Sequence, residues 1–114
     1  MKLNLGCGHD HKDGYINVDV SDLGNPDQVV DLEVLPWPWE DNAVDEILIK
    51  HTLEHLGQAT KLYLDIMCEF WRICQDGALI KIIVPHHRHD HFLNDPTHVR
   101  AITPGGLELF SQKK

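Results

Sequence analysis

The sequence predicts an α/β fold built on a parallel sheet. Residues 46–50 and 78–84 form continuous apolar runs, as expected for strands that are buried on both faces. Between them, apolar side chains recur at helical spacing, which predicts the crossover helix that two parallel strands require. Near the N-terminus, a short apolar run leads into a Gly-x-Gly turn, which is typical of a strand that ends at a ligand site.

The first two predicted strands are residues 2–5 and 15–20. The first ends in the turn Gly6-Cys7-Gly8, where glycine lets the backbone bend sharply and leaves no side chain between it and a ligand. The second closes on Asp19, whose carboxylate can accept hydrogen bonds from a ribose. The segment that joins them is shorter than the about twelve residues of a usual parallel crossover, so its helix must be a stub or absent.

Three more strands are predicted at residues 28–31, 46–50 and 78–84. The helix before the last strand is predicted from Ala59 to Cys74, and Asp76-Gly77 ends its pattern. The segment 36–39 reads Pro-Trp-Pro-Trp and cannot continue a helix, so it is predicted to be a loop. Its two indoles either stack on a bound base or pack against the sheet.

Composition indicates one domain. The chain has 114 residues, of which 42% are hydrophobic, and its formal net charge of −8 argues against a nucleic-acid partner. The three cysteines are odd in number and lack Cys-x-x-Cys spacing, so neither a disulfide framework nor a cysteine metal site is implied. With no apolar run long enough to span a bilayer and no signal peptide, the expected location is the cytoplasm, without a membrane partner.

The glycine turn disfavours a dinucleotide. A dinucleotide fingerprint needs a third glycine, and His11 stands at that position. Asp10 beside the turn would repel a pyrophosphate, whereas S-adenosylmethionine (SAM) has no phosphate and carries cationic groups that tolerate acidic neighbours.

An ordered set of motifs resembles the class I SAM-dependent methyltransferases over nearly the whole chain. The segments are residues 4–8 (Asn-Leu-Gly-Cys-Gly), 16–19 (Ile-Asn-Val-Asp), 31–36 (starting Asp-Leu, ending Leu-Pro), 45–47 (Asp-Glu-Ile) and 51–56 (His-Thr-Leu-Glu-His-Leu). Two positions depart from the family pattern: the usual acidic residue ahead of the glycines is Asn4, and the third small residue of the turn is Asp10.

The resemblance implies a Rossmann-like parallel sheet in the order 3-2-1-4-5, with helices on its faces and without the usual final strands. It implies SAM as cofactor, with the glycine turn on its methionine part, Asp19 on the ribose and Asp31 near the adenine. The cofactor-binding residues expected on this basis are Leu5, Gly6, Cys7, Gly8, Asp19, Val20, Asp31, Leu32 and His51.

Histidines after the fourth and fifth strands are the candidates for catalysis. His51 and His55 follow the fourth strand, where open α/β sheets bind ligands, and a histidine there can act as general base. Glu54 either joins His55 as an acid near the transferred methyl or braces the following helix. His98 lies in a segment that borders the acceptor pocket in some of these methyltransferases, so it is a third candidate unless it is tied to a structural turn; Arg100 can pair there with an anionic acceptor.

The histidine-rich segment 86–91, with Asp95 and His98 nearby, invites a metal interpretation. Adjacent histidines on a loop point in different directions, so a substrate-facing loop is preferred and no metal site is assigned.

These observations predict a methyltransferase that moves a methyl group to an oxygen or nitrogen of a small-molecule or sugar-like acceptor. The alternatives are a SAM-binding domain without catalysis and a histidine-rich metal-binding protein. Residues 1–114 are expected to form one such domain, and the fifth strand is expected at an open edge. That edge implies either a homo-oligomer that covers it or a chain shorter than its natural parent.

Overall fold

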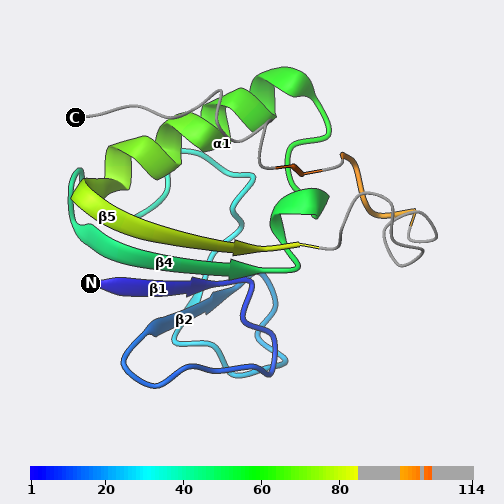
Figure 1. The fold of residues 1–114 in the computed structure, drawn as a ribbon. Coiled ribbons are helices and arrows are strands. Elements are labelled where there is room, and N and C mark those ends of the chain that lie inside the picture. The colour runs from blue at the N-terminus through cyan, green and yellow to red at the C-terminus, as the bar shows by residue number, and fades with distance from the viewer. Residues whose placement is uncertain (85–95, 101, 104–114) are drawn as a thin grey trace.

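A five-stranded parallel sheet forms the centre of the protein (Figure 1). The computed structural model describes residues 1–84, 96–100 and 102–103. The strands are β1 (Lys2–Leu5), β2 (Ile16–Asp19), β3 (Gln28–Val29), β4 (Val44–Lys50) and β5 (Cys74–Ile83). Every pairing is parallel and the order is β3-β2-β1-β4-β5. The predicted sheet and its strand order are therefore confirmed.

Helical cover comes from α1 (Thr60–Ile73) and the short 3-10 helix η1 (Leu53–His55), both between β4 and β5. Figure 1 shows α1 lying along one side of β4 and β5. The predicted helix is thus present with nearly the expected bounds. Residues 6–15, between β1 and β2, contain no helix, as the short connection required.

The core lies between α1 and the sheet face it covers. Alternate residues of the strands face α1, and they meet the buried stripe of that helix. The fully buried aliphatic side chains of this core are Leu3, Leu5, Val18, Val44, Ile47, Ile49, Leu53, Ile66 and Ile73.

Four of the five strands, β2, β3, β4 and β5, begin or end at residues other than those predicted, and β2 and β4 differ by no more than two residues at either end. β3 stops at Val29 because Asp31 accepts hydrogen bonds from the next turn, at its backbone oxygen from Val34 (3.0 Å) and at its carboxylate from Glu33 (2.9 Å). β5 begins at Cys74, directly after α1, and its register against β4 shifts between Val44 and Glu46. The predicted helix stop at residues 76–77 therefore falls inside an irregular stretch of β5.

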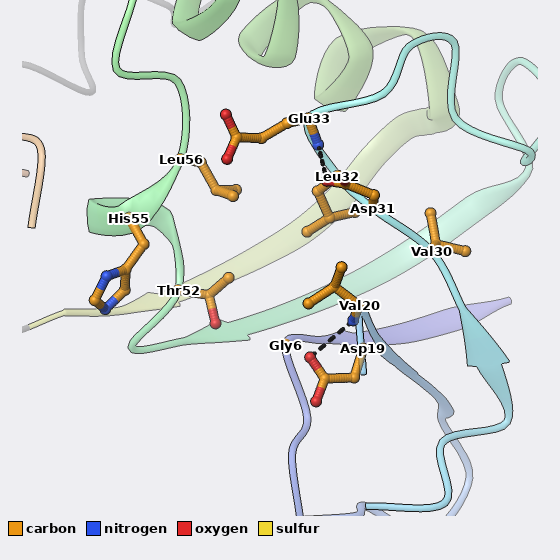
Figure 2. A pocket seen from close by; sticks show the side chains of 10 residues that line it. All are labelled: Gly6, Asp19, Val20, Val30, Asp31, Leu32, Glu33, Thr52, His55 and Leu56. Carbon is orange, nitrogen blue, oxygen red and sulfur yellow. Dashed lines mark hydrogen bonds between the residues drawn. The ribbon is translucent and has the colours of Figure 1, made fainter. Parts of the chain in front are cut away.

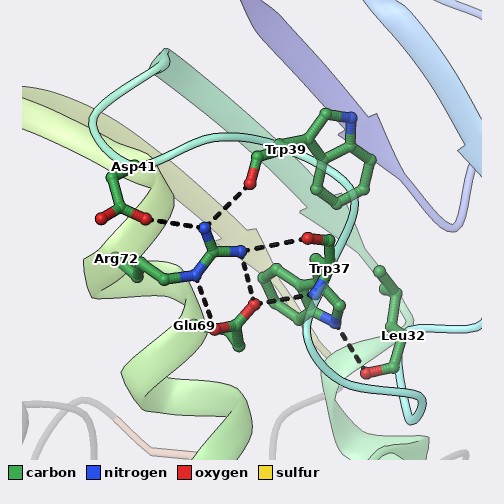
Figure 3. A network of polar contacts seen from close by, with 6 residues as sticks. All are labelled: Leu32, Trp37, Trp39, Asp41, Glu69 and Arg72. Carbon is green, nitrogen blue, oxygen red and sulfur yellow. Dashed lines mark hydrogen bonds and ion pairs between the residues drawn. The ribbon is translucent and has the colours of Figure 1, made fainter.

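The proline-tryptophan loop packs against α1 (Figure 3). Trp37 and Trp39 are 2% and 5% exposed, and Trp37 meets Phe70 edge to face at 5.0 Å between ring centroids. Arg72 donates hydrogen bonds to the backbone oxygens of both tryptophans and a bidentate pair to Glu69, which also accepts from the Trp37 N–H. The structure supports the packing alternative for both indoles over stacking on a base.

Candidate functional site

A pocket of about 320 Å³ opens at the carboxyl ends of β1, β2 and β4 and beside the segment that follows β3 (Figure 2). This is where open parallel sheets bind ligands, at the point where the strand order reverses. Its lining residues are Gly6, Asp19, Val20, Val30, Asp31, Leu32, Glu33, Thr52, His55 and Leu56.

The glycine turn joins the end of β1 to the segment after β4. Gly6 has a φ of +69°, and a Cβ there would lie 2.0 Å from Oγ1 and 2.9 Å from Cβ of Thr52. Gly8 has a φ of +50°, yet a Cβ on it would meet nothing within 4 Å. Gly6 is therefore required by the close approach of Thr52 as well as by the turn, whereas Gly8 is required by its backbone conformation alone.

Cys7, between the two glycines, faces the interior and not the pocket. Its N–H donates to the backbone oxygen of Val18 (3.0 Å), and its side chain is 5% exposed. Burial raises the pKa of the Cys7 thiol, and the negative charge of Asp19 raises this pKa further. Cys7 thus anchors the turn as a neutral, buried thiol.

Two buried asparagines fix the loop that follows the turn. Asn4 donates from Nδ2 to the backbone oxygen of Asp10 and to Oδ1 of Asn17, both at 2.9 Å. Asn17 in turn donates from its backbone N–H (2.8 Å) and its amide (3.1 Å) to Asp27, and these hydrogen bonds lower the pKa of the Asp27 carboxyl. Asn4, where the family pattern has an acid, therefore acts as a donor that ties residues 6–17 to the sheet.

Carboxylates dominate the charge of the pocket. Asp19 and Asp31 each accept one hydrogen bond at Oδ1, from the N–H of Val20 and of Glu33 respectively, both at 2.9 Å. Glu33 adds a third carboxylate, and none of the lining residues is a lysine or an arginine. This lining attracts cations and polyhydroxy groups and repels phosphate.

Trp37 supports the wall of the pocket from behind. Its indole Nε1 donates to the backbone oxygen of Leu32 at 2.9 Å. Because Trp37 is itself held by Glu69 and Arg72 of α1, the position of Leu32 is linked to the helix (Figure 3).

The other side of the pocket is lined by Thr52, His55 and Leu56, and residues 97 and 98 contact His55. His55 lies on the pocket wall, and its Nδ1 is 2.9 Å from Oγ1 and 3.1 Å from the backbone oxygen of Thr97. The ring of His98 packs on that of His55 with 4.5 Å between centroids. Two of the three histidines expected to act in catalysis thus lie together, although the sequence separates them by more than forty residues.

Arg100 contacts Tyr63 of α1 and the residues just before that helix. Its guanidinium lies 3.9 Å from the centroid of the Tyr63 ring and donates to the backbone oxygens of Gly57 and Gln58. These contacts join residues 96–100 to the start of α1.

The pocket contains five of the nine residues expected to bind cofactor: Gly6, Asp19, Val20, Asp31 and Leu32. The other four lie outside it. Leu5 is in the core, Cys7 and Gly8 are in the turn, and His51 is exposed with a φ of +50°.

Sequence reasoning missed four lining residues: Val30, Glu33, Thr52 and Leu56. Thr52 and Leu56 lie in the same motif as His51 and His55, which is the signal that would have identified them.

The histidine-rich segment 86–91 and Asp95 lie outside the described residues. In the part of the chain that is described, no cluster of three histidine, cysteine, aspartate or glutamate side chains could hold a metal ion. Nor does that part contain a helix with the length and apolar character needed to span a membrane.

Comparisons with solved structures agree with the architecture. A SAM-dependent methyltransferase from Archaeoglobus fulgidus superposes with a TM-score of 0.75 at 22% identity, and the match covers 96% of this chain and 57% of that one. The chain shares this fold. The YcgJ protein from Bacillus subtilis superposes with a TM-score of 0.70 at 17% identity, covering 96% of this chain and 58% of YcgJ. The chain thus spans less than two thirds of either neighbour.

No family model matches the sequence, and no curated protein does. The likeness therefore rests on the shape of the chain, which adds to the motifs that the sequence itself presents.

Proposed function

We propose that this protein is a SAM-dependent methyltransferase whose acceptor is a small molecule. The observation that carries the proposal is the placement of Gly6 and Asp19 at the ends of adjacent parallel strands, on one pocket. The fold shared with the Archaeoglobus methyltransferase supports it.

The lining residues fit the parts of SAM. The turn at Gly6 exposes backbone to the methionine part, and Asp19 offers a carboxylate oxygen to the ribose hydroxyls. Asp31 and Leu32 would bind the adenine, one through its carboxylate and the other through an apolar side chain. The acidic lining suits the positive charge of the sulfonium and amino groups and disfavours a nucleotide phosphate.

The other residues expected to bind the cofactor have supporting or acceptor-side roles in this proposal. Leu5, Cys7 and Gly8 hold the turn in shape, and Val20 contributes apolar surface beside Asp19. His51 stays a proposed contact on the acceptor side, together with His55 and His98.

When bound, SAM would supply an electrophilic methyl group for in-line transfer to an oxygen or nitrogen of the acceptor. The chain's own contribution is to align the two reactants, which can supply most of the rate. His55 lies on the pocket wall and has a ring nitrogen that can take a proton from the acceptor. A histidine suits this task because its ordinary pKa of about 6.5 lies near neutral pH.

Calorimetric titration with SAM and with its demethylated product tests the cofactor site. Asp19→Ala should weaken binding by about 100-fold, because hydrogen bonds to a charged group contribute about 1.5–3 kcal/mol each. Asp22→Ala is the matched control, since it removes the same charge at an exposed position three residues away, off the pocket. Equal loss in both variants, or no saturable binding by the folded wild type, would contradict the proposal.

An acceptor screen then separates a methyltransferase from a SAM-binding domain without catalysis. Methyl transfer to small molecules with hydroxyl or amino groups supports the first, whereas tight SAM binding without transfer supports the second. The proposal also places the single domain of residues 1–114 in the cytoplasm, without a nucleic-acid partner.

Self-association is proposed through β5, the longer of the two edge strands of the described sheet. This strand exposes Leu79 and Ile83, which are 51% and 43% exposed. An exposed edge of this kind is a site for pairing with another chain.

A further inference from the structure

Glu54 is the one charged residue that the fold buries completely among the described residues. It lies in η1 with an exposed fraction of 0%, and neither carboxylate oxygen has a hydrogen-bond partner in the part of the chain that the structure describes. Its backbone oxygen accepts from the N–H of Val99 (2.8 Å), which joins η1 to residues 96–100.

Glu54 does not brace α1 as a helix cap. The N-cap residue of α1 is Ala59, and no side chain forms a capping hydrogen bond there. The ionisable group that approaches the carboxylate is His55, whose Nε2 lies 4.0 Å from Oε1. The carboxylate therefore faces a residue of the pocket wall.

The two nitrogens of His55 meet different kinds of partner. Nε2 faces the Glu54 carboxylate, which when ionised can only accept a hydrogen bond. Nδ1 faces the backbone oxygen of Thr97, which can only accept, and its hydroxyl, which can donate. A neutral imidazole carries one proton, so the two acceptors compete for it.

At 4.0 Å, Oε1 of Glu54 is beyond hydrogen-bond distance of Nε2, so the carboxylate acts on the proton through its charge, which burial leaves poorly screened. Burying a neutral polar group without a hydrogen bond costs about 1–3 kcal/mol, and burying a charged group without one costs more. Losing one ordinary hydrogen bond costs only about 1 kcal/mol net. Thr97 is exposed, so water can satisfy its backbone oxygen. Glu54 has no such access.

We propose that Glu54 is a positioning residue that keeps the proton of neutral His55 on Nε2 and leaves Nδ1, beside the Thr97 hydroxyl, as the basic nitrogen. In this arrangement the Thr97 hydroxyl donates to Nδ1 at 2.9 Å. The packed ring of His98 holds the imidazole from the side.

This inference rests on the proposed function for its chemical consequence. An acceptor O–H or N–H that replaces the Thr97 hydroxyl at Nδ1 would give its proton to the nitrogen lone pair. The electrons of the broken bond would stay on the acceptor atom, which would attack the methyl carbon of SAM while the carbon–sulfur bond breaks and its electron pair leaves with the demethylated product. Glu54 balances the positive charge that His55 gains, and solvent later removes the proton.

The test is nuclear magnetic resonance of the wild type labelled with 15N-histidine, recorded at pH 8.5 without SAM. Long-range proton–nitrogen correlations distinguish the two tautomers, and His55→Gln identifies the signals of His55 by their loss. We expect the Nε2–H form to exceed the Nδ1–H form by about tenfold, which corresponds to about 1.4 kcal/mol. A majority of the Nδ1–H form would overturn the proposal.

Glu54→Gln keeps the size of the side chain and removes its charge. The introduced carboxamide can donate to Nε2, so the tenfold preference for the Nε2–H form should be lost. Retention of the wild-type preference would mean that the charge of Glu54 does not set the tautomer, which overturns the proposal.

Thr97→Val provides a second test at an exposed position, where folding is not at risk. If the carboxylate sets the tautomer, the Nε2–H form stays dominant without the hydroxyl; a change to Nδ1–H would show that Thr97 sets it and would overturn the proposal. Since these spectra contain no SAM, their outcome is independent of whether the calorimetry detects SAM binding.

Discussion

Alanine substitution at Gly6 should damage the protein more than the same substitution at Gly8. Both glycines have positive φ values, +69° and +50°, and an alanine in that region costs about 1–2 kcal/mol. Only at Gly6 does the new methyl group collide, 2.0 Å from Oγ1 and 2.9 Å from Cβ of Thr52. Because Cβ cannot move without the backbone, overpacking adds about 1–3 kcal/mol.

We therefore expect Gly8→Ala to lower the free energy of unfolding by about 1–2 kcal/mol and Gly6→Ala by about 2–5 kcal/mol. Urea titration followed by tryptophan fluorescence measures both, because Trp37 and Trp39 are buried. Equal losses, within about 0.5 kcal/mol, would refute the argument that Thr52 limits the space at Gly6.

A double-mutant cycle isolates the contact. Thr52→Ala removes Oγ1 and Cγ2, two of the three atoms that the new methyl group would strike. By itself this change should cost about 1 kcal/mol, because the hydrogen bond from Thr52 to the Lys50 backbone oxygen is lost. The double variant should lose less free energy of unfolding than the sum of the losses in the two single variants, by at least about 0.5 kcal/mol. Strict additivity would contradict the steric account.

Charge networks and thiols give three further predictions. Arg72→Met should lower the free energy of unfolding in urea by about 3 kcal/mol, while Asp41→Asn should cost less than about 1 kcal/mol because Asp41 is 71% exposed. The hydrogen bonds from Arg72 lower the pKa of Glu69, so its ionised form stabilises the fold above the ordinary glutamate pKa of about 4.3. That contribution is lost as the pH falls through the lowered pKa of Glu69. The difference in free energy of unfolding between wild type and Glu69→Gln should therefore become smaller from pH 7 to pH 3. An unchanged difference would contradict the lowered pKa. In thiol labelling at pH 7, exposed Cys68 should react fast and Cys7 slowly, because Cys7 is buried and its pKa is raised; similar rates would contradict the burial of the turn.

The sheet was predictable because its strands carry their own signals. β1 matches its predicted bounds, since an apolar run enters a glycine turn, and α1 follows its apolar spacing. The start of β5 was not predictable, because residues 74–77 read as a helix stop and pair with β4 only through a register shift. At these residues the pairing of β5 with β4 overrides the local helix-stop pattern.

The site was predictable where it depends on strand ends. Asp19 and Gly6 come directly after apolar runs, and the carboxyl ends of parallel strands meet at one edge. The tryptophans were less predictable, because an aromatic pair between prolines fits either a base or a core. Their burial follows from Arg72 and Glu69, on a helix that begins more than twenty residues later.

The acceptor side depends on contacts that no local pattern contains. Val99 donates to the Glu54 backbone, Thr97 meets His55, and Arg100 lies on Tyr63, so residues 96–100 are fixed to the segment 54–63 at three points. Each contact spans nearly forty residues or more of the chain. A histidine's role depends on which of its nitrogens faces which partner, and that is decided only when the two segments meet. For this reason the sequence nominates His55 as a base, but the geometry is needed to assign Nδ1 to that task and Glu54 to its support.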